Sequence, residues 1–223
     1  VARNLQNRNH KTDITPIVSS GDKNLTEPLY AMGITGIFTK DLDIALLNNE
    51  VDIAVHSLKD IPTQLPKNIE ILAVLQRDFP QDVLVRKSTS KDKELHELKI
   101  ATSSLRRRAF WAKHYPETEF FDIRGNVQTR LQKLEDQDFD ATLFSLAAIE
   151  RMGLNVDYEF LPMMICAPAQ GVIAVTARAD DHEIKELFKE VNHRETRICI
   201  DIERNFLRTL EGGCTAPIGA FAE

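Results

Sequence analysis

The sequence predicts an α/β fold in which helices cover mostly parallel sheets. Short runs rich in apolar and β-branched residues alternate with amphipathic stretches of helical length along the 223-residue chain. One run, VDIAV at 51–55, is almost continuously apolar, which is typical of a strand buried on both faces. Near residue 180 two helices follow each other directly, and this break in the alternation indicates another domain.

The expected elements follow in chain order. Residues 1–10 have the pattern of a helix end, and strands are expected at 14–18, 51–55, 69–75, 83–86, 100–102, 119–123, 141–144 and 172–177. Helices are expected at 40–48, 104–114, 126–135, 146–152, 180–191 and 195–210. Val127, Leu131 and Leu134 recur at helical spacing and should face a core. The last helix carries an apolar stripe of Cys199, Ile202, Phe206 and Leu210.

Composition narrows the functional class. The chain has 28 Lys and Arg against 34 Asp and Glu, and its net charge of -6 disfavours a general nucleic-acid binder. No apolar run is long enough to span a membrane, and no signal peptide opens the sequence. The cysteines at 166, 199 and 214 have neither paired nor metal-ligand spacing, so a reduced, cytoplasmic protein without a metal site is expected.

Polar segments follow several of the predicted strands, at the position where ligands bind in open α/β sheets. Ser57, Lys59 and Asp60 come directly after the VDIAV run. The adjacent Lys and Asp can offer a cation and a carboxylate to one ligand. A solvated loop with an incidental ion pair explains this segment equally well when it is taken alone.

The segment TSSLRRR at 102–108 joins a predicted strand to a helix. Hydroxyl groups at a helix start can satisfy its free N–H groups, and the same N–H groups can hold an anion. These hydroxyls belong to Thr102, Ser103 and Ser104. Because successive helical residues point in different directions, the three arginines cannot all face one ligand. Arg106 and Arg107 are the expected anion contacts, and Arg108 is expected in solvent.

Two later segments add arginines. Gly125 permits close approach of a ligand between Arg124 and Asn126, and Arg130 lies one turn further along the helix. A simple turn and helix cap, with Arg130 exposed, explains the same residues. Arg151 is a weaker candidate, because a cation near a helix C-terminus needs no ligand.

Cys214 is the remaining candidate. It lies in a glycine-rich loop, EGGCTAP, that can expose its sulfur. Cys166 and Cys199 have apolar neighbours and are expected in the core. No local His supports a protease-like nucleophile at Cys214.

Five stretches, taken in their order and spacing, resemble the porphobilinogen deaminase (hydroxymethylbilane synthase) family along essentially the whole chain. They are VDIAVHSLKDIPT (51–63), ATSSLRRRAFW (101–111), DIRGNVQTRLQKL (122–134), AQGVIAV (169–175) and ERNFLRTLEGGCTAPIGA (203–220). The resemblance implies two lobes with the fold of periplasmic solute-binding proteins and a small α+β third domain, truncated here. The implied domains are 1–75 with 172–192, then 76–171, and then 193–223.

The resemblance also implies a reaction. Four porphobilinogen molecules would be joined head to tail, each losing ammonia, and water would release hydroxymethylbilane for tetrapyrrole and heme biosynthesis. A dipyrromethane primer would be held as a thioether on Cys214, and Asp60 would be the catalytic carboxylate. The small molecule porphobilinogen is the expected partner of a monomeric enzyme that engages no nucleic acid and no membrane.

Each pyrrole unit carries an acetate and a propionate, so the growing chain is rich in carboxylates, which suit the bidentate, always-charged guanidinium group. The residues that match binding positions of the family are Asp22, Ser57, Lys59, Thr102, Ser103, Ser104, Arg106, Arg107, Arg124, Gly125, Asn126, Arg130, Arg151 and Gln170. Some positions depart from the family pattern. Ala31 and Thr35 stand where relatives commonly have Lys, and Ala169 stands where Gly is usual.

Two alternatives from other functional classes stay open. A two-lobed solute-binding or effector-sensing module for a carboxylate ligand, without catalysis, would suit the same fold. The Lys59–Asp60 pair and the EGGC loop favour the enzyme, because a simple carboxylate binder needs neither. A thiol enzyme with Cys214 as a transient nucleophile would lack a base and would form no stable pyrrole adduct.

Overall fold

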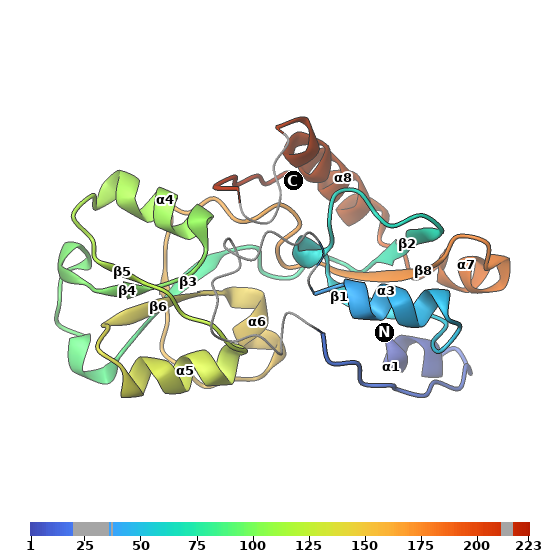
Figure 1. Ribbon diagram of the computed structural model, residues 1–223, viewed down its shortest axis with the longest axis horizontal. Helices are drawn as coiled ribbons and strands as arrows, with labels where there is room; N and C mark the ends of the chain where they lie inside the picture. The colour runs from blue at the N-terminus through green and yellow to red at the C-terminus, as the bar shows by residue number, and fades with distance from the viewer. Residues whose placement is uncertain (20–35, 37, 211–215) are drawn as a thin grey trace.

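The computed structural model describes residues 1–19, 36, 38–210 and 216–223, which form two α/β lobes joined by two chain segments (Figure 1). The first lobe contains β1 (Ala54–Ser57), β2 (Ile69–Val74) and β8 (Ile173–Arg178). The second lobe runs from β3 (Asp82–Arg86) to β7 (Glu159–Phe160). The chain therefore crosses to the second lobe after β2 and returns before β8. The predicted α/β fold with two lobes is confirmed.

The described strands of the second lobe form a five-stranded sheet in the order β5 (Phe120–Phe121), β4 (Ile100–Ala101), β6 (Ala141–Ser145), β3 and β7. The helix α4 (Leu105–His114) lies on one face, and α5 (Val127–Asp136) and α6 (Leu146–Arg151) lie on the other (Figure 1). Residues of β3 alternate between these faces. Leu84 packs in a cluster with Trp111 of α4, whereas Val83 packs in a cluster with Leu134 of α5.

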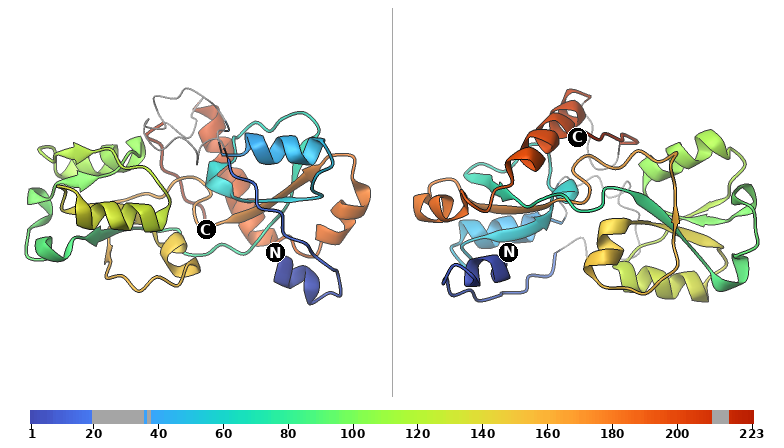
Figure 2. Two further views of the ribbon diagram at one scale, coloured as in Figure 1. Left: turned by 60° about the horizontal axis from the view of Figure 1, so that its bottom comes forward. Right: turned by 180° about the vertical axis from the view of Figure 1, so that it is seen from behind.

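β8 is the central strand of the described three-stranded sheet in the first lobe. Its Ala174 shares a core with Ile200 of α8 (Arg194–Thr209), and its Val175 shares another core with Phe188 of α7 (His182–Phe188). The helices α1 (Ala2–Gln6) and α3 (Lys40–Leu47) belong to the same lobe (Figure 2). One-turn 3-10 helices lie at Leu58–Asp60, Ser88–Ser90 and Leu95–Glu97. None of the helices in these described ranges has the length and apolar character needed to cross a membrane.

The expectation of mostly parallel sheets is wrong. Among the described strands, only the pairs β4–β5 and β4–β6 are parallel, whereas β8 and β3 run antiparallel to both of their neighbours. β3 and β8 are the first strands after the two crossings between lobes. A helix that connects two parallel strands returns the chain to the end of the sheet at which the previous strand began. The chain that crosses from the other lobe makes no such return, so β3 and β8 run opposite to their neighbours.

Two predicted strands are also placed wrongly. Residues 14–18 form no strand, and Ile14 and Val18 are exposed because no described strand lies beside them to pair with their backbone. β1 begins at Ala54 rather than Val51, and Val55 is 45% exposed, so burial on both faces is also wrong. β1 is an edge strand of the described sheet, and its residues alternate between core and solvent.

The last helix packs through a face that differs from its apolar stripe. The buried residues of α8 are Thr196, Ile200 and Glu203, whereas Ile202, Phe206 and Leu210 are exposed. Glu203 is buried because it pairs with Arg77, which orients the helix through a polar contact. Among the cysteines expected in the core, Cys166 is buried and Cys199 is only partly buried.

Candidate active site at the boundary between the lobes

Predicted site residues from both lobes meet around Asp82, a residue absent from the sequence-based prediction. Asp82 begins β3 directly after the first crossing between lobes, and its side chain is 0% exposed. Arg106 Nη1 donates to Asp82 Oδ2 at 2.6 Å, while Arg107 donates to Oδ1 through Nε at 3.0 Å and through Nη2 at 2.8 Å. An acidic residue at the head of an apolar strand, DVLV, is the sequence signal that indicates such a buried partner.

The two arginines are held deep in the second lobe. Arg106 Nη1 also donates to the Ile165 carbonyl at 2.5 Å, and Arg107 Nη1 donates to the Leu143 carbonyl at 2.8 Å. Burial would raise the pKa of Asp82, but Arg107 and Arg106 outweigh that effect and hold it well below its usual range. One carboxylate thus faces two guanidinium groups, and the cluster keeps a net positive charge.

Gln170 connects this cluster to the first lobe. It is fully buried in the segment that returns to β8, and its Nε2 donates to Pro80 O at 2.7 Å and to Asp82 Oδ1 at 3.1 Å. Its Oε1 accepts from Lys59 Nζ at 3.2 Å. Burial lowers the pKa of Lys59 to about 8, against the opposing effect of the neighbouring Asp60. Lys59 and Arg107 therefore lie within electrostatic reach of each other.

The end of β1 positions Lys59 and Asp60. His56 and Ser57, which follow the predicted strand 51–55, are the last residues of β1, and Lys59 and Asp60 lie in the one-turn helix that follows. His56 Nε2 contacts Thr176 Oγ1 of β8 at 3.1 Å, and Leu58 N donates to Val172 O at 2.9 Å. Burial lowers the pKa of His56 to about 4, so the imidazole is neutral near pH 7. Ser57, Lys59 and Asp60 are all partly buried.

The hydroxyl residues before α4 hold the loop in place. Ser103 Oγ donates to the Ile123 carbonyl at 3.0 Å and accepts from the Ile123 N–H at 2.9 Å. Ser104 caps α4 by accepting from the Arg107 N–H, and Thr102 Oγ1 accepts from the Ser104 N–H. These contacts join the ends of β4 and β5 and fix the start of the helix.

The expectation that Arg108 lies in solvent is wrong. Arg108 Nε donates to the Thr102 carbonyl and Nη2 to Asp122 Oδ1, each at 2.7 Å. The guanidinium also stacks over the Phe120 ring, with 5.6 Å between its central carbon and the ring centroid. The side chain turns back onto the strands because a carbonyl and a carboxylate lie within its reach.

Arg130 is a partly buried cation without a carboxylate partner among the described residues. Its guanidinium carbon lies 4.3 Å from the Phe144 ring centroid, and its Nε is buried without a hydrogen-bond acceptor in the described ranges. Burial, followed by repulsion from Arg107 and Arg124, lowers the pKa of Arg130 to about 9. The alternative that Arg130 is exposed is wrong. An anionic ligand fits this site, because it would supply the missing charge.

The turn before α5 brings Arg124 against this cluster. Gly125 has φ +117°, and a Cβ there would lie 2.6 Å from the Thr129 side chain, so only glycine fits without rearrangement. Asn126 Oδ1 accepts from the Thr129 N–H at 2.8 Å, so Asn126 forms the helix cap. Arg124 itself is 8% exposed.

Arg151 binds the two segments that join the lobes. Its Nε donates to Asp78 Oδ2 at 2.9 Å and its Nη2 to the Gly171 carbonyl at 2.6 Å. The Asp78 N–H also donates to the Gly171 carbonyl at 3.0 Å, so the outgoing and returning segments lie side by side here. Arg151 thus lies at the lobe boundary, but it contacts Asp78 and Gly171 and not the Asp82 that Arg106 and Arg107 contact.

Comparison with known proteins identifies the family. The family model described as "Porphobilinogen deaminase, dipyromethane cofactor binding domain" matches residues 1–186, and the one described as "Porphobilinogen deaminase, C-terminal domain" matches residues 197–223. The chain belongs to the porphobilinogen deaminase family. A probable porphobilinogen deaminase of Methanocaldococcus jannaschii is 46% identical over 100% of this chain and 76% of the relative. The porphobilinogen deaminase of Desulforamulus reducens is 44% identical over 98% of this chain and 72% of the relative.

Solved structures with a weaker similarity include two proteins of other families. An amino acid ABC transporter substrate-binding protein from Streptococcus pneumoniae has a TM-score of 0.40 and 14% identity, covering 75% of this chain and 66% of its own. CbnR, a LysR family transcriptional regulator, has a TM-score of 0.44 and 15% identity, covering 71% of this chain and 56% of its own.

Asp22 and Cys214, together with Ala31 and Thr35, lie outside the described residues. Ala169, by contrast, is described and has φ +62°, a left-handed conformation that glycine adopts more readily than alanine.

A network around Glu203 lies beside Gln170 and is absent from the sequence-based prediction. Glu203 accepts from both Nη atoms of Arg77 at 2.8 Å and from the backbone N–H groups of Ala169 at 2.6 Å and Ala222 at 2.8 Å. It thereby ties α8 to both connecting segments and to the described residues that follow the Cys214 loop. No local sequence pattern predicts this contact, because Arg77 and Ala169 lie far from Glu203 along the chain.

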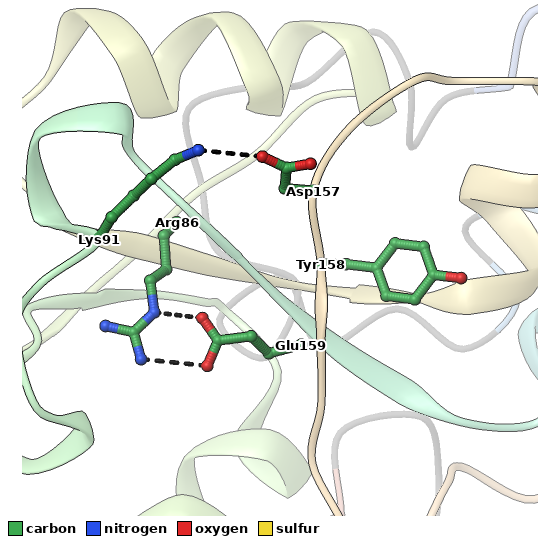
Figure 3. Close-up of a pocket in the computed structure, with 5 residues that line it drawn as sticks. All are labelled: Arg86, Lys91, Asp157, Tyr158 and Glu159. Atoms are coloured by element: carbon green, nitrogen blue, oxygen red, sulfur yellow. Dashed lines mark hydrogen bonds and ion pairs between the residues drawn. The ribbon is translucent and has the colours of Figure 1, made fainter.

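The cavity drawn in Figure 3 lies elsewhere, at the edge of the second lobe. It is lined by Arg86, Lys91, Asp157, Tyr158 and Glu159. Arg86 forms a bidentate ion pair with Glu159, and Lys91 Nζ lies 3.0 Å from Asp157 Oδ2. Its charges are compensated within the cavity, so it is not the candidate active site.

Proposed function

We propose that this chain is a hydroxymethylbilane synthase that joins four porphobilinogen molecules and one water into hydroxymethylbilane, with release of four ammonia molecules. The observation that carries this function is the buried guanidinium cluster of Arg107, Arg124 and Arg130 beside the Lys59–Asp60 turn, in a chain of the porphobilinogen deaminase family. Arg107 interacts electrostatically with both Lys59 and Arg130, so these cations act on one region.

The arginines and Lys59 would hold the acetate and propionate groups of the substrate and of the growing chain. Guanidinium groups remain charged and bind carboxylates in a bidentate manner, and partial burial strengthens each contact. Arg130 fits this role because its buried Nε has no acceptor in the described part of the chain. The proposed binding residues are Asp22, Ser57, Lys59, Thr102, Ser103, Ser104, Arg106, Arg107, Arg124, Gly125, Asn126, Arg130, Arg151 and Gln170.

Asp60 would carry the catalysis. Positive charge develops on porphobilinogen as its amino group leaves, and a carboxylate held beside the pyrrole N–H stabilises that charge. The same carboxylate can then accept or relay the proton lost from the attacking pyrrole carbon. The dipyrromethane, bound through Cys214, would supply the free pyrrole carbon at which the chain grows.

The proposed domains are 1–75 with 172–192, then 76–171, and then 193–223. The crossings after β2 and before β8 support the first two boundaries. The break after α7 supports the third. We also propose a cytoplasmic monomer that binds no nucleic acid and no membrane, in keeping with the net charge of -6. Light scattering after size exclusion tests the monomer.

Intact-mass measurement tests the cofactor. The purified protein should exceed its sequence mass by one dipyrromethane, and Cys214→Ala should remove the excess while Cys199→Ala retains it. An active wild-type protein without added mass would contradict the covalent primer. A non-catalytic carboxylate-binding module would bind porphobilinogen without releasing ammonia.

Substitution of Asp60 tests the catalytic role. Asp60→Asn should lower turnover by about a hundredfold or more while porphobilinogen still binds, because the amide can neither stabilise the cation nor accept the proton. Asp157→Asn, at an exposed ion pair in the second lobe, is the matched control and should keep full turnover. Near-normal turnover in Asp60→Asn would exclude this assignment.

A further inference from the structure

Asp82 links two arginines of the second lobe to Gln170, the residue that contacts Lys59, although it matches none of the predicted site positions. Its two carboxylate oxygens accept from Arg106, Arg107 and Gln170, and Gln170 accepts from Lys59. We propose that Asp82 is a positioning residue that fixes the Lys59 ammonium group against the arginines of the second lobe. The value of that position for catalysis rests on the proposed function.

The hydrogen bonds of Asp82 require a carboxylate. Oδ1 accepts from Nε and Nη2 of Arg107 and from Nε2 of Gln170, while Oδ2 accepts from Nη1 of Arg106. Every contact on both oxygens is therefore a donor. An asparagine would direct its NH₂ group at a donor in either orientation, so it cannot reproduce the arrangement.

Gln170 has one available orientation for the same reason. Its NH₂ group donates to Asp82 and to the Pro80 carbonyl, which leaves its carbonyl oxygen toward Lys59. If the acceptor at Asp82 is lost, the Pro80 carbonyl is the one acceptor of these two that still orients the Gln170 amide, so the carbonyl oxygen that faces Lys59 is held less firmly. The position of Lys59 in the first lobe thus depends in part on a carboxylate in the second lobe.

Asp82 also balances the charge that Lys59 experiences. Among the described residues, Asp60 and Asp82 favour the ammonium form of Lys59, and Arg106 and Arg107 oppose it. Removal of the Asp82 charge takes away the carboxylate that both guanidinium groups contact in the described part of the chain. Lys59 should then lose its proton at a lower pH than in the wild-type protein.

Trace acetylation of Lys59 measures this effect directly. The full-length wild-type protein and Asp82→Asn would be labelled with acetic anhydride across pH 6 to 11, and the Lys59 peptide quantified by mass spectrometry. The titration midpoint, near pH 8 in the wild type, should fall by about one pH unit in the variant. kcat/KM for porphobilinogen should fall about a hundredfold, with its basic limb displaced in the same direction.

Asp140→Asn is the matched control for destabilisation. Asp140 is a buried carboxylate of the same lobe that accepts from Ser90, Lys93 and the Lys99 N–H, and neither Lys59 nor Gln170 is among these donors. This variant should lower Tm and leave the Lys59 midpoint unchanged. If Asp82 had a purely structural role, Asp82→Asn would also lower Tm and leave the Lys59 midpoint unchanged. That outcome would show that the positioning role is wrong. Equal displacement of the midpoint in both variants would also overturn it.

Gln170→Met provides a second test if Asp82→Asn does not fold. It removes the bridge to Lys59 and leaves the ion pairs of Asp82 with Arg106 and Arg107 intact. The Lys59 midpoint should move, and an unchanged midpoint would overturn the positioning role. Because acetylation does not depend on turnover, a wild-type protein that releases no ammonia from porphobilinogen would refute the proposed function alone.

Discussion

Arg130 illustrates how a functional residue can oppose folding. Its Nε is buried and has no hydrogen-bond acceptor among the described residues, so the hydration that it loses on folding is not replaced by a contact with them. The Phe144 ring recovers part of that loss, because a cation lies favourably over an aromatic face. The remaining cost is offset when a carboxylate binds, so ligand binding and stability are coupled at this residue.

Replacement of Arg130 should therefore change stability and binding in opposite directions. In a Cys214→Ala background, Arg130→Met should raise the free energy of unfolding by about 1 kcal/mol or more, because it removes a desolvated cation. Carboxylate binding should weaken. Denaturant unfolding and calorimetric titration with porphobilinogen measure the two effects. Arg86→Met, which breaks the ion pair with Glu159, is the control and should destabilise the fold.

His56 should make stability depend on pH. Its pKa is about 4 in the folded protein and 6.5 in the unfolded chain, so the unfolded state binds a proton first as the pH falls. The stability contributed by the neutral imidazole is complete above pH 6.5 and is lost between pH 6.5 and 4. Between pH 7 and 4.5, the wild type should lose about 2 kcal/mol more than His56→Gln.

Urea unfolding at several pH values tests this difference. The exposed His114 provides the control, and His114→Gln should follow the wild-type curve. Parallel curves for wild type and His56→Gln would show that His56 does not titrate on unfolding.

Helices and strands followed from the sequence wherever local signals decide structure. Ser104 and Asn126 cap helices at the positions that their side chains predict, and Val127 and Leu134 face the core as their spacing requires. Strand direction and the packed face of α8 did not follow, because both depend on which distant segment arrives beside them. Asp82 and Glu203 were not predicted as functional contacts, because their arginine partners are distant in sequence.

The close approach of the two segments that connect the lobes requires a glycine at position 171. Gly171 has φ +85°, and a Cβ there would lie 2.9 Å from the Phe79 carbonyl oxygen. Gly171→Ala should therefore cost about 2 kcal/mol more than Gly153→Ala, because both impose a left-handed Ala but only the first meets backbone atoms. Thermal unfolding of the two variants gives the comparison, and equal losses would show that the segments separate easily.

For the whole molecule, the second lobe is an insertion within the first. All of its described strands lie between residues 82 and 160, whereas the first lobe needs β8 from beyond residue 172. A fragment of residues 76–171 should fold cooperatively, and a fragment of residues 1–75 should not, because it lacks its central strand. Circular dichroism with urea unfolding measures both. Cooperative folding of 1–75 would show that β8 is dispensable.

The central position of β8 also imposes an order on synthesis. As the chain leaves the ribosome, β1 and β2 emerge before β8, the strand that lies between them in the described sheet, and the inserted lobe emerges complete before β8 does. In the nascent first lobe, β1 and β2 must therefore wait for β8 while about a hundred further residues are translated, which takes several seconds or more. Chaperone binding to nascent chains should concentrate in that interval.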